Sequence, residues 1–378
     1  MKTSIFRLLL PLTLLLIITG LPTGAAPIER TASAVTNVCG TIDTNTTWSL
    51  INSPYDVCIG GVNVSFGAQL YVDQAVVTMT NSLIRNGVSH GVYVASNNPQ
   101  VSIHDTSFTG NARNAIQLNQ PKSDILMSGL SASGNGVNGV FIAGSTMMNG
   151  QRRWAFTGIP YVIDAPVNMA AGDVLSIDPG NELQFTANGK LDILGEFKAI
   201  GLPTAPITLT GQIKTPGAWV GLDVHGAAVD QAIAQLDYVT VEYGGSATDG
   251  ANIGVRFGGQ LVARHSVIRY SSKDGVRNDS TTSSLSLLNS HVYGNTLYGV
   301  RNQTANMAIL ATNNWWGDAN GPKSDTAACS TGNGDKVTNG VIFRPVLTDT
   351  LTTRSFPLSD APILTLTPRR WVAPADGT

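Results

Sequence analysis

The chain has 378 residues, of which 13% are charged, and its formal net charge is −2 at pH 7. Soluble domains usually carry roughly 25% charged residues, and a chain so close to neutrality has no electrostatic reason to bind nucleic acid or an anionic membrane. The 42% of hydrophobic residues can form a buried core, and the 40 glycines indicate many tight turns.

Residues 1–25 have the pattern of a secretory signal peptide. Lys2 and Arg7 give a positive start, the apolar stretch LLLPLTLLLIITG follows, and Thr23-Gly24-Ala25 offers the small residues that a signal peptidase reads. A membrane-spanning helix needs about 20 apolar residues, more than this stretch has. We therefore expect an exported chain, secreted or held at the cell surface, with no membrane span after signal removal and with a linker over residues 26–38.

The three cysteines are Cys39, Cys58 and Cys329. Cys39 and Cys58 can form a disulfide in an oxidising compartment, and three free buried thiols are the alternative. None of the three has a histidine neighbour or a CxxC spacing, so we do not expect metal binding or thiol catalysis from them.

A degenerate repeat dominates the chain. The tetrapeptides GVYV, AIQL and GVFI begin at residues 91, 115 and 139, and the tripeptide GVR recurs at residues 254, 275 and 299. Each unit holds short alternating apolar and polar runs, such as VSIHDTSF (101–108), which are typical of strands. Such runs cannot bury a face alone, but stacked turns of chain can, because each strand pairs in parallel with its equivalent one turn later. The sequence therefore predicts an all-β parallel solenoid with about 24 residues per turn.

The repeat divides into N-terminal β-helix turns over residues 39–150 and a main β-helix with a C-terminal cap over residues 151–349. The pair Arg152-Arg153 marks the junction, and Asp178-Pro179-Gly180 is a turn signal in the segment that follows. The sequence leaves open whether the two blocks share one core. Residues 350–378 are a tail or the start of a truncated immunoglobulin-like domain.

The stretch TNNWWGDANGPKSD (312–325) follows the last strand-like run. The last turn of a solenoid has no successor, so its interior needs a cover. We expect Trp315 and Trp316 to supply that cover as a structural cap. Calcium is a minor alternative, because oxygen donors gather here without the spacing of an EF-hand loop; these are Asp318, Asn320, Ser324 and Asp325.

Several segments, taken in order, resemble bacterial right-handed parallel β-helix proteins of the pectate-lyase-like superfamily. They are DVLSIDPGNELQF, LDILGEFKAIG, APITLTG and AWVGL, and the NNWWGDANGPKSD segment resembles the one that closes many of these helices. The resemblance covers roughly residues 80–349 and implies a right-handed parallel β-helix. It says little about function, since one fold hosts many activities.

The catalytic motifs that this resemblance would bring are absent from the sequence. Neither the N-T-D, D-D, G-H-G and R-I-K motifs of pectin hydrolases nor the W-I-D-H and R-x-P-x-x-R motifs of pectate lyases occur. We therefore expect a binding, adhesive or structural role, with an acidic polysaccharide or a cell-envelope glycan as the partner. The alternative is a polysaccharide lyase or glycoside hydrolase whose acids come from separate turns; the candidates are Asp237, Glu242, Asp274 and Asp279.

The GVR repeats supply the candidate ligand-binding residues. Side chains alternate along a strand, so Arg256, Arg277 and Arg301 are expected to point outward and to stack about 4.8 Å apart. Tyr93 and Phe141 hold the corresponding positions in the N-terminal repeat, and all five would form one exposed ladder suited to a polymer. The alternative is a surface of splayed or screened arginines without a ligand. Next to the arginines, an inward asparagine ladder is expected, formed by Asn278 and Asn302.

Overall fold

The computed structural model describes residues 35–42, 46–49, 55–64, 70–73, 76–95, 100–119, 126–144, 146–147, 150–226, 232–248, 250–304, 308–325 and 332–349. All regular structure in these ranges is β-strand, and every ladder between named strands is parallel. The chain is thus the predicted parallel β-solenoid. The signal peptide, most of the linker, Cys329 and residues 350–378 lie outside the described residues.

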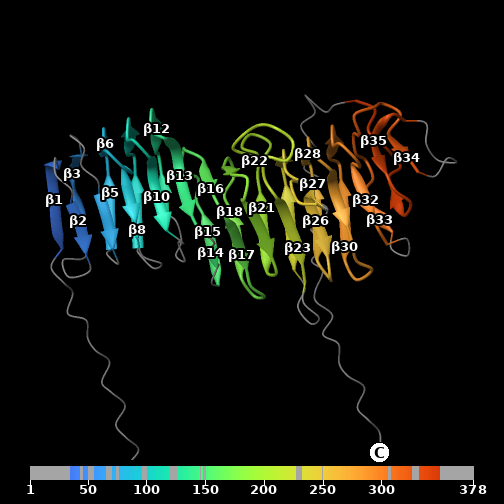
Figure 1. Cartoon of the computed structure of the whole chain (residues 1–378), viewed down its shortest axis with the longest axis horizontal. Coiled ribbons are helices and arrows are strands. Elements are labelled where there is room, and N and C mark those ends of the chain that lie inside the picture. Colours follow the sequence, from blue (N-terminus) through green and yellow to red (C-terminus); the bar gives the residue numbers. More distant parts are fainter. Residues whose placement is uncertain are drawn as a thin grey trace, which may run out of the picture. The chain divides into compact units, whose positions relative to one another are not determined.

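Four sheets form the walls of the solenoid (Figure 1). In sheets 2, 3 and 4 the strands stack in chain order, apart from the last two strands of sheet 3, whereas sheet 1 continues in both directions from a central strand. Sheet 1 is N-terminal and contains, in order, β11 (Leu126–Ser128), β8 (Gln100–His104), β5 (Val76–Thr80), β3 (Tyr55–Val64), β6 (Leu83–Arg85), β9 (Ser107–Thr109) and β12 (Ser131–Ser133), with β1 (Thr36–Ile42) also paired to β3. Sheet 2 has eleven strands: β2 (Thr46–Ser49), β4 (Leu70–Asp73), β7 (Val92–Val94), β10 (Asn114–Asn119), β13 (Val137–Ala143), β16 (Tyr161–Ile163), β19 (Glu182–Phe185), β22 (Ile207–Gly211), β25 (Val239–Glu242), β28 (Val267–Arg269) and β31 (His291–Tyr293).

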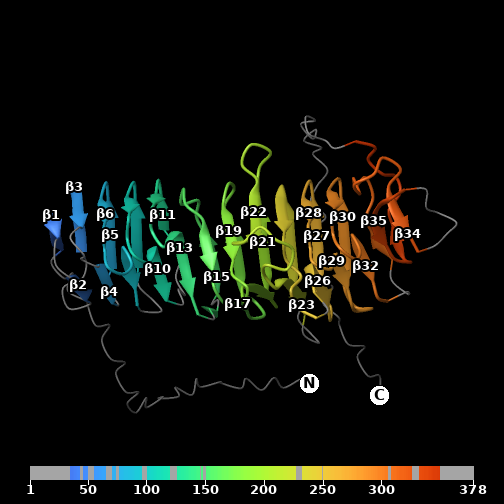
Figure 2. The same cartoon turned by 45° about the horizontal axis from the view of Figure 1, so that its top comes forward.

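Apart from β14, the strands of the other two sheets belong to the main block (Figure 2). Sheet 3 contains β14 (Thr146–Met147), β17 (Pro166–Met169), β20 (Lys190–Ile193), β23 (Gly221–His225), β26 (Ala251–Arg256), β29 (Asp274–Asn278), β32 (Val300–Asn302), β35 (Gly334–Val337) and β34 (Pro322–Ser324). Sheet 4 contains β15 (Gln151–Trp154), β18 (Val174–Ile177), β21 (Glu196–Ile200), β24 (Ile233–Asp237), β27 (Gln260–Arg264), β30 (Ser284–Leu288), β33 (Ile309–Leu310) and β36 (Val341–Ile342).

The repeat of the sequence becomes the register of the strands. Tyr93 lies opposite Gln117, and Gln117 lies opposite Phe141, so each step is one coil of 24 residues. Within a strand, every second residue points inward, as the alternating burial of Val174–Ile177 shows. The sequence pattern therefore fixes which side chains fill the core and which face solvent.

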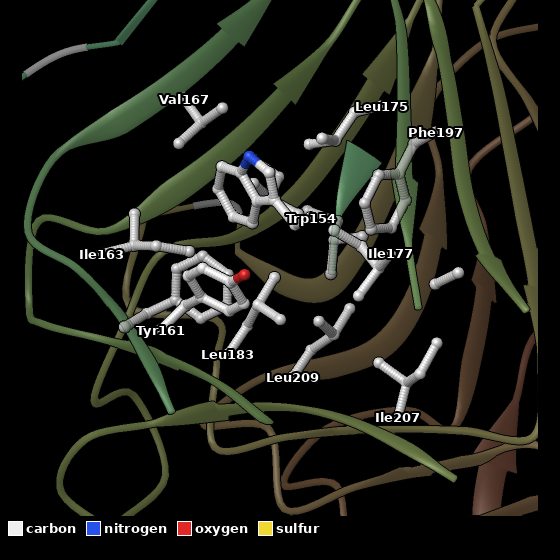
Figure 3. Packing of buried hydrophobic residues seen from close by; sticks show 14 of the residues in the cluster. Trp154, Tyr161, Ile163, Val167, Leu175, Ile177, Leu183, Phe197, Ile207 and Leu209 are labelled. Carbon is white, nitrogen blue, oxygen red and sulfur yellow. The ribbon is translucent and has the colours of Figure 1, made fainter. Parts of the chain in front are cut away.

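The core is one cluster of buried hydrophobic residues that runs from Tyr55 to Phe343. Figure 3 shows part of it, where Trp154 and Tyr161 lie among aliphatic side chains. The rings of these two residues stack, with centroids 5.2 Å apart. The single cluster answers a question that the sequence left open, because residues of both blocks belong to it.

Buried amides bridge successive coils inside the solenoid. Asn278 Nδ2 donates to Asn302 Oδ1 at 3.1 Å, which confirms the predicted asparagine ladder. Asn111 Nδ2 donates in the same way to Asn135 Oδ1 at 2.7 Å. Such bonds satisfy polar groups that burial would otherwise leave unpaired.

The change from one block to the other falls between β12 and β16. Strands β11 and β12 end sheet 1, whereas β14 and β15 begin sheets 3 and 4, and sheet 2 continues through the change. Sheet 4 starts at Gln151, and the first strand of sheet 1 starts at Thr36, three residues before the predicted start of the N-terminal turns. Cys39 in β1 is disulfide-bonded. The register of β1 and β3 pairs Val38 with Val57 and shifts between Val38 and Gly40. Cys58 as the partner of Cys39 stays a prediction.

At the C-terminal end, the two tryptophans have different surroundings. Trp316 is fully buried and belongs to the core cluster, whereas Trp315 is half-buried and its backbone bridges to His291 at the last strand of sheet 2. Strands β34, β35 and β36 follow in the chain and extend sheets 3 and 4. The cap function of the pair stays a prediction.

Candidate functional site

A strip of charged residues lies on the outer face of sheet 3. The register places five residues in one column across β20, β23, β26, β29 and β32. These are Asp192, Asp223, Gly254, Arg277 and Arg301. Their strand neighbours, such as Leu191 and Val224, are buried in the core, so alternation turns the column outward. We call the charged strip the set Lys190, Asp192, Asp223, His225, Arg256, Arg277, Asp279 and Arg301.

The predicted stack of three arginines is wrong in register. Arg277 pairs with Arg301, but Gly254, and not Arg256, lies opposite Arg277. Arg256 lies two residues further along, opposite His225. Because a slip of two residues keeps every side chain on the same face, the alternating pattern of the GVR segments fitted either register.

The predicted ladder of arginines and aromatic residues also divides between two sheets. Tyr93 and Phe141 lie on β7 and β13 of sheet 2, whereas the arginines lie on sheet 3. On sheet 2, the outward column runs from Tyr71 through Tyr93 and Gln117 to Phe141. The five candidate residues therefore form two surfaces, because the repeating unit occupies different sheets in the two blocks.

Asp223 is the centre of the charged strip. Its Oδ1 accepts a hydrogen bond from Arg256 Nε at 2.8 Å, and its Oδ2 is bound by Lys190 Nζ at 2.8 Å and by Arg256 Nη2. Burial alone would raise the pKa of this carboxyl, but the hydrogen bonds and charges of Arg256 and Lys190 outweigh burial and lower the pKa. Asp223 is therefore a firmly ionised group.

The remaining charges of the strip are also paired. Lys190 Nζ lies 3.0 Å from Asp192 Oδ1, which in turn contacts His225 Nε2 at 2.9 Å. Arg277 Nε donates to Asp279 Oδ1 at 2.7 Å, and Arg301 Nη1 lies 3.7 Å from Asp274 Oδ2. The four cations of the strip thus face its three carboxylates and that of buried Asp274, and their formal charges cancel when all are ionised.

Asp274 lies fully buried beneath the arginines at the start of β29. Neither carboxylate oxygen has a hydrogen-bond partner among the described residues. Burial raises the pKa of Asp274 to about 6, against the opposing charges of Arg301 and Arg277. At neutral pH the protein therefore holds a buried carboxylate at a cost in stability.

We expect Asp274→Asn to stabilise the protein above pH 6. The folded-state pKa of about 6 exceeds the ordinary value of 3.8, so the folded state binds more protons in this window and loses stability as pH rises through it. The neutral amide avoids that loss, which amounts to about 2–3 kcal/mol. Thermal melts at pH 4.5 and 7.5 check this: the stability difference between the variant and the parent chain should grow at the higher pH. An equal or lower melting temperature for the variant at pH 7.5 contradicts the prediction.

Asp192, Asp223 and His225 bring three potential metal ligands within 4.8 Å of one another. The ammonium group of Lys190, however, lies 3.0 and 2.8 Å from the same two carboxylates, where a cation would bind. In the 312–325 segment, Asp325 pairs with Lys336 at 2.6 Å, and Asp318 Oδ1 accepts the Asn320 amide proton at 2.9 Å. The side chains at both places thus already have protein partners, and calcium stays an untested alternative.

A cleft of about 230 Å³ opens over the charged strip. Residues of β23, β26 and β29 form its floor, and Ala247 and Gly250 line it from the segment before β26. The charged residues that line it are Lys190, Asp223, Arg256, Arg277 and Asp279, with Gly254 between them. The sequence analysis missed Lys190, Asp192, Asp223 and His225, although the alternating segments KLDI and GLDV carried an outward acid on each strand.

The carboxylates considered for catalysis are spread over three sheets. Glu242 is buried, accepts hydrogen bonds from Thr210 Oγ1 at 3.0 Å and Arg269 Nε at 2.7 Å, and thus forms an ion pair within the sheet. Asp237, the last residue of β24 in sheet 4, contacts His265 Nδ1 at 2.8 Å. These two acids therefore have separate partners, while Asp274 and Asp279 belong to sheet 3.

Comparison with known proteins found no family model, no curated protein and no solved structure that matches the chain. Among the described residues, no helix has the length and apolar character needed to cross a membrane.

Proposed function

We propose that the mature chain is an exported β-helix protein, secreted or held at the cell surface, that binds a polysaccharide or a cell-envelope glycan. The observation that carries the proposal is the outward column of sheet 2. Tyr71, Tyr93, Gln117 and Phe141 occupy successive rungs, and the rings of Tyr71 and Tyr93 lie 5.2 Å apart. Aromatic faces and an amide, repeated at the strand spacing of about 4.8 Å, suit a chain of sugar rings.

The resemblance to pectate-lyase-like proteins supports the same proposal in its finer details. It favours a bacterial origin, and it favours a closing role for the segment NNWWGDANGPKSD (313–325). The signal-peptide pattern of residues 1–25 supports export.

The charged strip supports binding of an acidic polymer less than the sequence indicated. Each of the three predicted arginines contacts an acid, so the strip has no excess positive charge to attract a polyanion. An acidic ligand stays within the proposal, but its acidic groups would have to find cations elsewhere.

A polysaccharide lyase or glycoside hydrolase is the second candidate, and it has weaker support. A glycosidase needs one carboxyl with a raised pKa to act as general acid and a second one nearby. The pKa of Asp223 is lowered by its cationic partners, and Asp274, whose pKa is raised, is fully buried. Assays of polyuronates for unsaturated products and for new reducing ends separate the two candidates, and we expect neither product.

Replacing Tyr93 and Phe141 with alanine should weaken glycan binding. Each lost aromatic contact is worth about 0.5–1.5 kcal/mol, so the double variant should bind about tenfold more weakly or worse. The measurement is a binding isotherm on immobilised acidic and neutral polysaccharides. Thermal melts should first show that the double variant and the parent chain are equally stable. Ser286→Ala on the outer face of sheet 4 is the control and should bind like the parent chain. Unchanged binding by the double variant contradicts the role of sheet 2.

A further inference from the structure

Gly254 is a glycine that the fold itself does not require. It lies inside strand β26, where glycine is unfavourable because it loses more backbone entropy than other residues and packs nothing. Its φ is not positive, and a Cβ built on it would meet its nearest atoms at 3.8 Å, an ordinary contact. The other described glycines whose surroundings are defined either have positive φ or would place a Cβ within 2.9 Å of another atom.

A glycine inside a strand often marks a place where a ligand approaches the backbone closely. Gly254 lies in the floor of the 230 Å³ cleft. In the column of sheet 3 it separates the carboxylate of Asp223 from the guanidinium of Arg277. The missing side chain therefore leaves a gap between the Asp223 carboxylate and the Arg277 guanidinium. This gap lies where Gly254 lines the cleft.

The groups around the gap select the chemistry of the ligand. The place of a metal ion is taken by Lys190 Nζ, which lies 2.8 Å from Asp223. Three cations and two carboxylates line the cleft, and Asp192 beside it balances the third cation, Lys190, at 3.0 Å. An anion would therefore find no excess positive charge, since Arg256 is paired with Asp223 and Arg277 with Asp279. An apolar ligand would remove these charges from water without replacing their hydrogen bonds. The ligand that fits is an uncharged group with many hydrogen-bond donors and acceptors.

We propose that the cleft over Gly254 binds one neutral sugar unit, whose hydroxyl groups donate to the carboxylates of Asp223 and Asp279 and accept from the guanidinium of Arg277. The volume of the cleft is below the roughly 300 Å³ at which pockets for drug-sized molecules begin, so a single ring of a longer chain enters it. This site lies on sheet 3 and does not depend on the column of sheet 2.

The test places a side chain at residue 254 and leaves every charged residue of the cleft unchanged. Gly254→Ala and Gly254→Val add one and three carbon atoms over the cleft floor, and Ser286→Val on sheet 4 adds a comparable apolar side chain elsewhere. The probes are cello-, manno- and galacto-oligosaccharides, with oligogalacturonate as the anionic arm, titrated by calorimetry. Amide chemical shifts of the labelled protein locate the bound probe.

We expect at least one neutral oligosaccharide to bind the parent chain and to shift the Gly254 amide. Gly254→Val should weaken this binding about tenfold or more, Gly254→Ala less, and Ser286→Val not at all. Both Gly254 variants should keep or raise the melting temperature, because any other residue has less freedom to lose than glycine. Binding should change little between low salt and about 0.5 M salt, since no net charge attracts the ligand.

Four results would each overturn the proposal. They are no binding of any neutral probe, unchanged binding by Gly254→Val, a lowered melting temperature for Gly254→Ala, and binding restricted to oligogalacturonate with strong salt dependence. The third would show that the strand needs glycine, and the fourth would indicate an anion site. The Tyr93 and Phe141 double variant keeps the cleft intact, so failure of this site and failure of the sheet 2 proposal can be told apart.

Discussion

Replacing Trp316 with alanine is expected to lower the free energy of unfolding by about 3–5 kcal/mol. The indole is fully buried in the core and fills the space beside Gly299, whose Cβ would lie 3.3 Å from Trp316 Cζ3. Its removal leaves a cavity at the C-terminal end of the stack, which the neighbouring strands cannot close without moving. Urea denaturation followed by fluorescence measures the change, and light scattering reports any association through the opened end.

Trp315→Ala is the matched control for this prediction. Trp315 is half-buried, so the same truncation should cost markedly less than at Trp316. If a variant with both tryptophans replaced stays soluble and equally stable but loses a glycan ligand, the segment is a binding site and the structural interpretation is wrong.

The second large effect is expected from changing Arg256, Arg277 and Arg301 to glutamine together. If the three arginines only repelled one another, replacing them would stabilise the protein. The structure instead shows each arginine in contact with an acid. Removing one partner of a fully buried ion pair costs about 3–5 kcal/mol, and each of these pairs should cost less, because one member of each is partly exposed. The largest share should come from Arg277, whose side chain is 10% exposed, while Arg256 at 41% should contribute less.

A thermal melt of the triple variant checks this, and we expect a clearly lowered melting temperature. Arg85→Gln, at an exposed position of β6, is the control and should melt like the parent chain. An unchanged or raised melting temperature, together with lost binding of an acidic polysaccharide, would instead make the arginines a ligand site.

The sequence was sufficient to predict the solenoid, because a 24-residue step survives in pairs such as Gln117 and Phe141. It was also sufficient for the contact of Asn278 with Asn302, which are one regular coil apart. The charged strip could not be predicted in this way. Lys190 and Asp223 are 33 residues apart, as are Asp223 and Arg256, because the coils between them carry longer connections. Spacing alone therefore gave no reason to bring these side chains together.

The register of the arginines failed for a different reason. Ile253 and Val255 are both buried, so either could occupy the inward position opposite Val276, and only the connection lengths decide in favour of Ile253. Alternation predicts which face a residue occupies, but it does not predict which residue lies beside it. The candidate cleft depends on this second kind of information, because Gly254 matters only through its neighbours Asp223 and Arg277.

Sheet 2 continues across the change from sheet 1 to sheets 3 and 4. This continuity affects how cooperatively the protein unfolds. In a stack of coils each unit is stabilised mainly by the units directly before and after it. At the change, sheet 1 ends and sheets 3 and 4 begin, while the ladder from β13 to β16 carries the pairing across. This ladder and the continuous core are therefore the contacts that decide whether the two blocks unfold as a single unit or in two steps.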